Sequence, residues 1–232
     1  MLQNIEQLSD VRRNILEALK RNGPVTIAEL ANRFAMTGEA IRQHLLILEK
    51  EGWVERKIFR ASHGAGRPST RYRLTSEGEH LFPKNYVSLA VEVIDTITEH
   101  FGQDALRHVL ESMTEHRVRE WEPRVNGLSL SERVNVLRDI YQENDAYMEI
   151  EQSGDQVCLI EKNCPFLNVA KRRPALCSVT VSAFTRLLGC RVVREERFQN
   201  GDGRCVFRVL VDQPIDPETS VFSYEDENLT HS

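Results

Sequence analysis

Apolar residues recur every three or four positions in three successive stretches near the start of the chain, which is the spacing of one buried helix face. The second stretch follows Thr26, with Glu29 three residues later, and the third follows Thr37. Thr and Glu at this spacing form the sequence of a capping box, which begins a helix. Gly52 then ends the third helix, and two strand-like stretches follow at 54–61 and 70–74, joined by a glycine-rich segment. The pattern predicts three helices followed by a β-hairpin.

The connection between the second and third predicted helices is short, at residues 35–37. A short connection holds two helices at a steep angle and lets the later one enter the major groove of DNA. The hairpin is rich in Arg and Lys, as contact with a phosphate backbone requires. Residues 1–83 carry 13 Lys and Arg against 10 Asp and Glu, whereas the rest carries 17 against 25. Residues 1–83 are therefore predicted to be a winged helix-turn-helix domain that binds double-stranded DNA.

The outward-facing residues at the start of the third helix are candidates for contact with base edges. Arg42 can pair with guanine and Gln43 with adenine, each through two hydrogen bonds. The alternative is a helix face that contacts only solvent. The basic hairpin that follows favours DNA. The predicted DNA-contacting residues are Thr37, Glu39, Arg42, Gln43, Arg56, Lys57, Arg60, Arg67 and Arg71.

Residues 84–145 show amphipathic helical periodicity in three stretches. The first ends at Gly102, the second stops before Pro123, and Ser129 opens the third. Long amphipathic helices beside a winged helix favour a homodimer, because a palindromic operator needs two recognition helices about one turn of DNA apart. We therefore expect this region to be a dimer contact and linker. The alternative is that its apolar faces pack against the C-terminal part of the chain.

Beyond Ala146 the apolar period shortens from that of helices to that of strands. Two strand pairs flank one helix that follows Pro174, and the polar stretch 213–232 is predicted to be a flexible tail. The chain as a whole is thus predicted to be an α+β protein, with residues 146–212 forming a mixed domain that senses a signal. The predicted strands lie at 147–152, 156–161, 190–198 and 204–211.

Four cysteines of this domain, Cys164, Cys177, Cys190 and Cys205, are separated by 12, 12 and 14 residues. Structural zinc sites use closely spaced cysteine pairs, whereas iron–sulfur clusters accept thiolates from widely separated positions. A buried apolar role is the alternative for any single cysteine. The fifth, Cys158, lies within a predicted strand and is expected in the core.

Helix geometry separates these four thiols. A helix between Cys177 and Cys190 places them at opposite ends, about 17 Å apart at 1.5 Å per residue. If the helix runs back against the strand that follows, Cys177 approaches the turn near Asn200 and therefore Cys205. Geometry thus favours Cys164, Cys177 and Cys205 as converging ligands.

The N-terminal part resembles winged-helix bacterial regulators related to the ArsR and DeoR groups, and nearly the whole chain resembles the SufR family of iron–sulfur-sensing repressors. The motifs that carry the second resemblance are Cys-Pro-Phe at 164–166, Pro-x-x-Cys at 174–177, Leu-Gly-Cys at 188–190, Gly-x-Cys-x-Phe at 203–207, Gly-Arg-Pro at 66–68 and Leu-Phe-Pro at 81–83.

This resemblance implies a homodimer that binds an iron–sulfur cluster of the 4Fe-4S type and represses genes for cluster assembly. It implies that Cys190 joins Cys164, Cys177 and Cys205 as a ligand, and that loss of the cluster relieves repression. The alternative is a winged-helix regulator that responds to a small organic effector.

The chain shows no signal peptide, no long apolar run and no arrangement of nucleophile and base. Five cysteines without such a signal indicate reduced thiols in the cytoplasm. We therefore expect a cytoplasmic regulator that neither enters a membrane nor acts as an enzyme.

Overall fold

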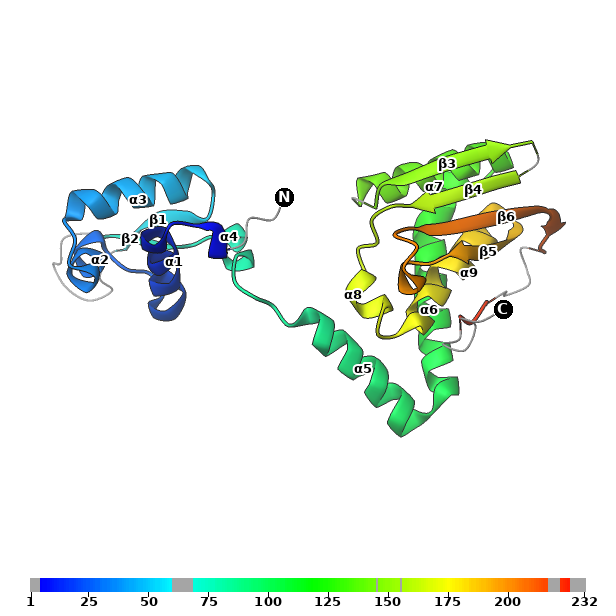
Figure 1. Cartoon of the computed structure of the whole chain (residues 1–232), viewed down its shortest axis with the longest axis horizontal. Helices are drawn as coiled ribbons and strands as arrows, with labels where there is room; N and C mark the ends of the chain where they lie inside the picture. Colours follow the sequence, from blue (N-terminus) through cyan, green and yellow to red (C-terminus); the bar gives the residue numbers. More distant parts are fainter. Residues whose placement is uncertain (1–4, 60–68, 145, 155, 217–221, 226–232) are drawn as a thin grey trace. The chain divides into compact units, whose positions relative to one another are not determined.

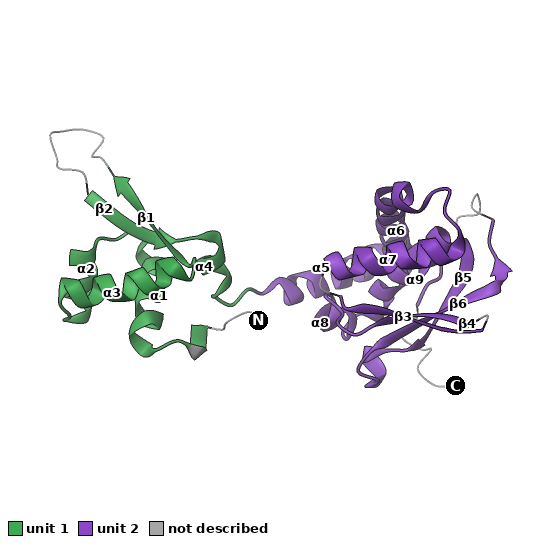
Figure 2. Cartoon of the chain, turned by 90° about the horizontal axis from the view of Figure 1, so that it is seen from above, with its two compact units in different colours: residues 1–84 green, residues 85–232 purple. Residues whose placement is uncertain are grey.

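The computed structural model describes residues 5–59, 69–144, 146–154, 156–216 and 222–225. The chain divides into two compact units, residues 1–84 and 85–232 (Figures 1 and 2). The first is a winged helix-turn-helix, and the second combines helices with one antiparallel sheet. The predicted α+β fold class is confirmed.

The N-terminal unit contains the three predicted helices and the predicted hairpin. Thr26 and Glu29 form the capping box at the start of the second helix, and the Thr37 side chain caps the third by accepting a hydrogen bond from the Ala40 amide. The hairpin strands pair in antiparallel register, from Val54 opposite Leu74 onward. The elements are η1 (Ile5–Gln7), α1 (Asp10–Asn22), α2 (Ile27–Phe34), α3 (Gly38–Lys50), β1 (Val54–Phe59), β2 (Ser69–Leu74) and α4 (Ser76–His80).

One core holds this unit together. The apolar faces of α1, α2 and α3 meet over the base of the hairpin, and Val25 forms an isolated bridge to Tyr72 in β2. The buried positions are those that the helical period predicted. The largest are Ile15, Leu16, Leu30, Ile41, Leu45 and Leu48.

The C-terminal unit contains a four-stranded antiparallel sheet in the order β3-β4-β6-β5. Helices α7 and α9 lie against one face of the sheet (Figure 1). The elements are α5 (Tyr86–Phe101), α6 (Gln103–Val125), α7 (Leu130–Glu143), β3 (Met148–Ser153), β4 (Gln156–Glu161), α8 (Leu167–Ala170), η2 (Pro174–Cys177), α9 (Ser178–Leu188), β5 (Cys190–Glu196), η3 (Phe198–Asn200) and β6 (Cys205–Pro214).

Helices from the predicted dimerisation region and strands from the predicted sensor region share one core. Val118 in α6 and Leu137 in α7 are buried in the same cluster as Phe184 in α9 and Phe207 in β6. The apolar face of the sheet is therefore covered by α6 and α7, which precede it in the chain, together with α9, which lies between β4 and β5. Residues 85–145 and 146–212 belong to one compact unit.

Helix α6 continues through Pro123 to Val125, whereas the sequence pattern predicted an end before this proline. Pro123 lies in the last turn and removes one helical hydrogen bond there, but the Asn126 amide still donates to the Glu122 carbonyl at 2.9 Å. Val125 is 2% exposed and packs in the core. Burial of Val125 favours the extra turn.

The chain end also differs from the predicted flexible tail, because residues 222–225 pack against the unit. Phe222 and Tyr224 contact the apolar cluster between α6 and η2. The Glu225 amide donates to Ser178 Oγ at 2.6 Å, at the start of α9. Two aromatic side chains in a polar stretch supply the apolar surface for this packing.

No helix in the described residues is long and apolar enough to cross a membrane.

Candidate cysteine pocket and DNA-binding surface

The start of α3 presents the predicted base-contacting residues on the surface of the N-terminal unit. Glu39, Arg42 and Gln43 are all exposed. Arg42 Nε lies 3.4 Å from one Glu39 oxygen, and Gln43 Nε2 donates to the other at 2.8 Å. The Thr37 side chain caps α3 and lies at the same end of this helix. These four residues are adjacent, as a reading surface at a helix N-terminus requires.

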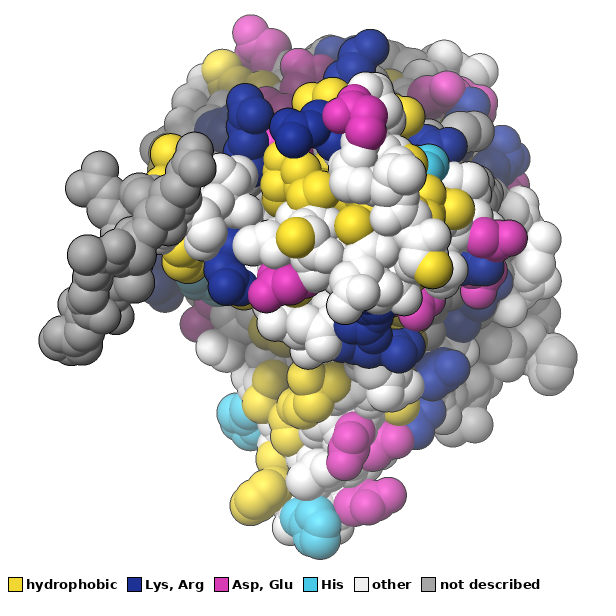
Figure 3. Space-filling model, turned by 90° about the vertical axis from the view of Figure 1, so that its left-hand side faces the viewer, with side chains coloured by type: hydrophobic (Ala, Val, Ile, Leu, Met, Phe, Trp, Pro, Cys, Tyr) yellow, Lys and Arg dark blue, Asp and Glu magenta, His cyan; other side chains and the backbone are white. Residues whose placement is uncertain are grey.

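Three predicted phosphate-contacting residues of the hairpin lie among the described residues, and each of these three has a carboxylate neighbour. Arg56 pairs with Glu49 at 3.6 Å, Lys57 with Glu55 at 3.7 Å, and Arg71 with Glu29 at 3.7 Å. On the face in Figure 3, Lys and Arg side chains lie in separate groups between neutral and acidic ones. Exposed pairs of this kind hold together weakly and are open to exchange for phosphate. Arg60 and Arg67 lie outside the described residues.

Three of the cysteines line one pocket in the C-terminal unit, with a volume of about 360 Å³. Cys164 follows β4, Cys177 caps α9, and Cys205 is the first residue of β6. Gln199 in η3 donates to Cys177 Sγ at 3.3 Å, so the start of α9 lies beside the turn before β6. This is the convergence that helix geometry predicted.

Cys190 does not line this pocket. It is buried at the start of β5, beyond the C-terminal end of α9. The 11-residue helix separates it from Cys177. The structure therefore does not bring Cys190 together with the other three thiols. Cys158 is half-buried outside the apolar core, because it lies on the side of β4 opposite to Leu159.

Burial favours the protonated form of two pocket thiols, Cys164 and Cys205. It raises the pKa of Cys164 to about 12, with the neighbouring Glu161 as a second cause. Burial also raises the pKa of Cys205. Because metals bind thiolates, any metal taken up here must displace these protons.

Two arginines and one glutamate supply buried charge to the pocket. The Arg194 side chain is 1% exposed and pairs with Glu225 at 2.5 Å. Arg117 donates to Thr180 Oγ1 at 3.1 Å. Glu161 is 5% exposed, and burial raises its pKa to about 7 against the opposing effect of both arginines.

These charged residues did not stand out in the sequence, although strand alternation carried a signal for two of them. Arg194 shares a strand face with Val192 and Cys190, and all three are buried. Glu161 ends the buried half of β4, after Leu159 and Ile160. A charged residue at an inward strand position is costly unless it is paired or functional.

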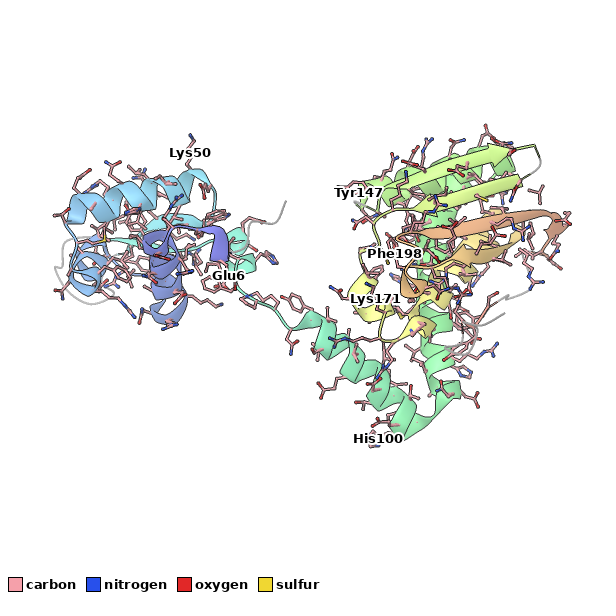
Figure 4. All side chains as sticks on the ribbon, in the orientation of Figure 1. Glu6, Lys50, His100, Tyr147, Lys171 and Phe198 are labelled. Carbon is pink, nitrogen blue, oxygen red and sulfur yellow. The ribbon has the colours of Figure 1, made fainter. Side chains whose placement is uncertain are left out.

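Aromatic side chains form much of the remaining wall. Phe198, labelled in Figure 4, contributes from η3 between β5 and β6. Gln199 Oε1 and Arg194 Nε are buried without a hydrogen-bond partner among the described residues. Buried polar atoms of this kind indicate a missing partner. The aromatic lining residues are Trp121, Tyr141, Phe166, Phe198 and Phe207.

The donor arrangement distinguishes between a single ion and a cluster. Among the described residues, no three His, Cys, Asp or Glu side chains are placed to hold one metal ion. A single zinc ion needs its ligands within about 2.3 Å of one centre. An iron–sulfur cluster bonds each thiolate to a different iron, so its ligands stand farther apart. The three thiols line one pocket but are not placed around a single metal position.

The fold and the exposed α3 surface define a winged-helix DNA-binding regulator. Residues 8–55 match the winged helix-turn-helix DNA-binding family. Residues 89–210 match methanogen output domain 1, and because this match covers more than half of the sequence, the chain belongs to that family. A comparison with curated proteins found no match. The two family matches support a winged-helix regulator and do not single out the SufR family.

Proposed function

We propose that this protein is an iron–sulfur-dependent transcriptional regulator in which Cys164, Cys177 and Cys205 hold a cluster, of the 4Fe-4S type, in the C-terminal unit. The observation that carries the proposal is that these thiols, from three separate elements, line one pocket. When bound, the cluster supplies sensitivity to oxidants and to iron supply. From the SufR resemblance, we expect the cluster-loaded protein to repress its target genes.

The charges around the pocket support an anionic occupant. Deprotonated thiolates and a cluster bring negative charge into a buried space, where an uncompensated charge is costly. Arg194 and Arg117 both line this space. The two guanidinium groups would stabilise the loaded site.

The segment between Cys164 and Cys177 contacts α5, the first helix of the C-terminal unit. Arg173 binds both carboxylate oxygens of Asp95 in α5. Helix α8, in the same segment, also packs against α5. In the chain, α5 begins two residues after Lys84, the last residue of the DNA-binding unit. Closing the segment around a cluster would shift α5 and so bias the DNA-binding unit.

Exposed apolar residues on α5 and α6 support the proposed homodimer. Leu89 is 59% exposed and Val93 is 50% exposed on α5, and Met113 is 43% exposed on α6. A winged helix that reads two half-sites needs a second copy, and apolar surfaces on the helices that follow the DNA-binding unit in the chain suit that contact. Operator binding by two copies follows from this arrangement.

Anaerobic reconstitution of the full-length protein tests the cluster. We expect iron, sulfide and visible absorption in the wild type, and loss of most of the cluster when Cys164, Cys177 or Cys205 is replaced by Ser. Cys190→Ser is the matched control, because Cys190 lies outside the pocket, and it should retain a full cluster. Retention of the cluster in all four variants contradicts the proposed site.

DNA affinity tests the regulatory part. At fixed salt, the loaded wild type should bind an operator more tightly than the cluster-free protein, and Asp95→Asn should reduce this difference. Asp139→Asn serves as the control, since Asp139 pairs with Arg138 on α7 and has no contact with the cysteine segment. Equal affinity of the loaded and cluster-free wild type contradicts the proposal.

A small organic effector is the second candidate, and the aromatic lining favours it. Ligand pockets are commonly apolar with a few polar groups that orient the ligand. Trp121, Tyr141 and Phe207 with Arg117 and Thr180 fit this description. A colourless, iron-free protein after anaerobic purification, carrying a small molecule detected by native mass spectrometry, would establish this alternative.

A further inference from the structure

We infer that Glu161 is the fourth protein ligand of the pocket, so that one iron of the cluster is bound by a carboxylate oxygen. This inference rests on the proposed cluster. Three thiols leave one iron of a 4Fe-4S cluster without a cysteine, and Cys190 lies at the other end of α9. The structure points to Glu161 for the remaining position.

Glu161 lies beside two of the thiols through the backbone. It is the last residue of β4, and its antiparallel partner in β6 is Cys205. The chain reaches Cys164 three residues later. All three side chains line the same pocket. Strand pairing with Cys205 and the short chain distance to Cys164 therefore both place Glu161 close to the proposed ligands.

The Glu161 side chain lines the pocket and is held mostly in the interior. The residue is 5% exposed, and Arg194 and Arg117 interact with its carboxyl group electrostatically. Of the two arginines, Arg194 has the larger electrostatic effect on Glu161, and Arg194 is already paired with Glu225. A carboxylate held in the interior costs stability in its charged form, and a bound iron would offset this cost. The same burial raises the pKa of Glu161.

One other carboxylate lines the pocket, and it provides the comparison. Glu120 lies on α6 and is exposed to solvent. A carboxylate that water already solvates gains less by binding a metal than one held in the interior. Glu161 is therefore the better candidate, and Glu120 is the matched control.

Binding of the cluster would release protons from the carboxyl group and from the thiols. On binding, the carboxyl group loses its proton to solvent, and one oxygen donates an electron pair to iron. The three thiols lose their protons in the same way. A carboxylate holds iron less firmly than a thiolate in a sulfur-rich site, so this iron would be the first to leave.

The test uses the reconstituted full-length protein with Glu161→Gln, Glu161→Cys and Glu120→Gln. We expect Glu161→Gln to lose its fourth iron in air on the order of tenfold faster than the wild type, with the electron paramagnetic resonance signal of a three-iron cluster. Glu161→Cys should lose it more slowly than the wild type, and Glu120→Gln should match the wild type. A wild-type rate and spectrum in Glu161→Gln overturns the inference.

Mössbauer spectra of the wild type, loaded with isotopically enriched iron, give a second measurement that does not depend on a variant. One iron site with oxygen ligation is expected beside three sites with sulfur ligation. Four equivalent sulfur-ligated sites overturn the fourth-ligand assignment and leave the cluster proposal intact. A wild type that takes up no iron overturns both.

Discussion

Arginine residues occupy opposite environments in the two units, and Arg42 and Arg194 show the difference. The Arg42 side chain is 56% exposed and shares Glu39 with Gln43 on the surface of α3. The Arg194 side chain is 1% exposed and is held by Glu225 beside the cysteine pocket. The exposed group can exchange its partner for DNA at little cost, whereas the buried group cannot lose a partner without leaving a charge in the interior. Substitutions on the DNA-binding surface should therefore have independent effects. Substitutions in the pocket should affect the stability of the neighbouring charged residues as well.

The largest effect should follow from removing the buried charge. We expect Arg194→Met to lower the free energy of unfolding by about 3 kcal/mol, because Glu225 loses one of its two cations and Glu161 loses a favourable neighbour. Urea denaturation of the cluster-free protein measures this change. Arg197→Met is the control, because Arg197 binds the same carboxylate at 3.2 Å but is more exposed. An equal loss in both variants would contradict the special role of burial at Arg194.

The next effect is the pH dependence of the cluster-free protein. Burial raises the pKa of Glu161 from 4.5 to about 7, so the folded protein retains a proton that the unfolded chain releases. Stability should therefore be greatest below pH 4.5 with respect to this group and fall as the pH rises to about 7. The fall should be on the order of 3 kcal/mol. Denaturation midpoints at several pH values measure it, and Glu161→Gln should remove this component. A slope that persists in the variant would assign it to other groups.

The smallest effect on the fold should come from the exposed arginine. We expect Arg42→Ala to weaken operator binding by about tenfold through the loss of paired hydrogen bonds to a base. Its effect on the free energy of unfolding should stay within about 0.5 kcal/mol. Fluorescence anisotropy and urea denaturation measure the two quantities. Arg138→Ala, an exposed change on α7, should leave DNA binding unchanged. A large loss of stability in Arg42→Ala would contradict the expected difference between the exposed Arg42 and the buried Arg194.

The N-terminal unit could be predicted almost element by element because its signals are local. Thr26 with Glu29 and Thr37 begin helices through contacts within one turn, and these contacts form whatever lies elsewhere in the chain. The end of α6 was less predictable, because burial of Val125 extends the helix past Pro123. The packing of Phe222 and Tyr224 was likewise decided by surface that other elements supply.

The sequence by itself determined the class of the DNA-binding unit, the strands of the sheet and the separation of Cys177 from Cys190, since a helix has a fixed rise per residue. Only the tertiary structure decided that Glu161, Arg117 and Arg194 face the three thiols. These residues come from β4, α6 and β5, and their meeting depends on sheet register and on the placement of α6. Local pattern carries no information on such distant pairs, because the energy that brings them together comes from burial of the whole core.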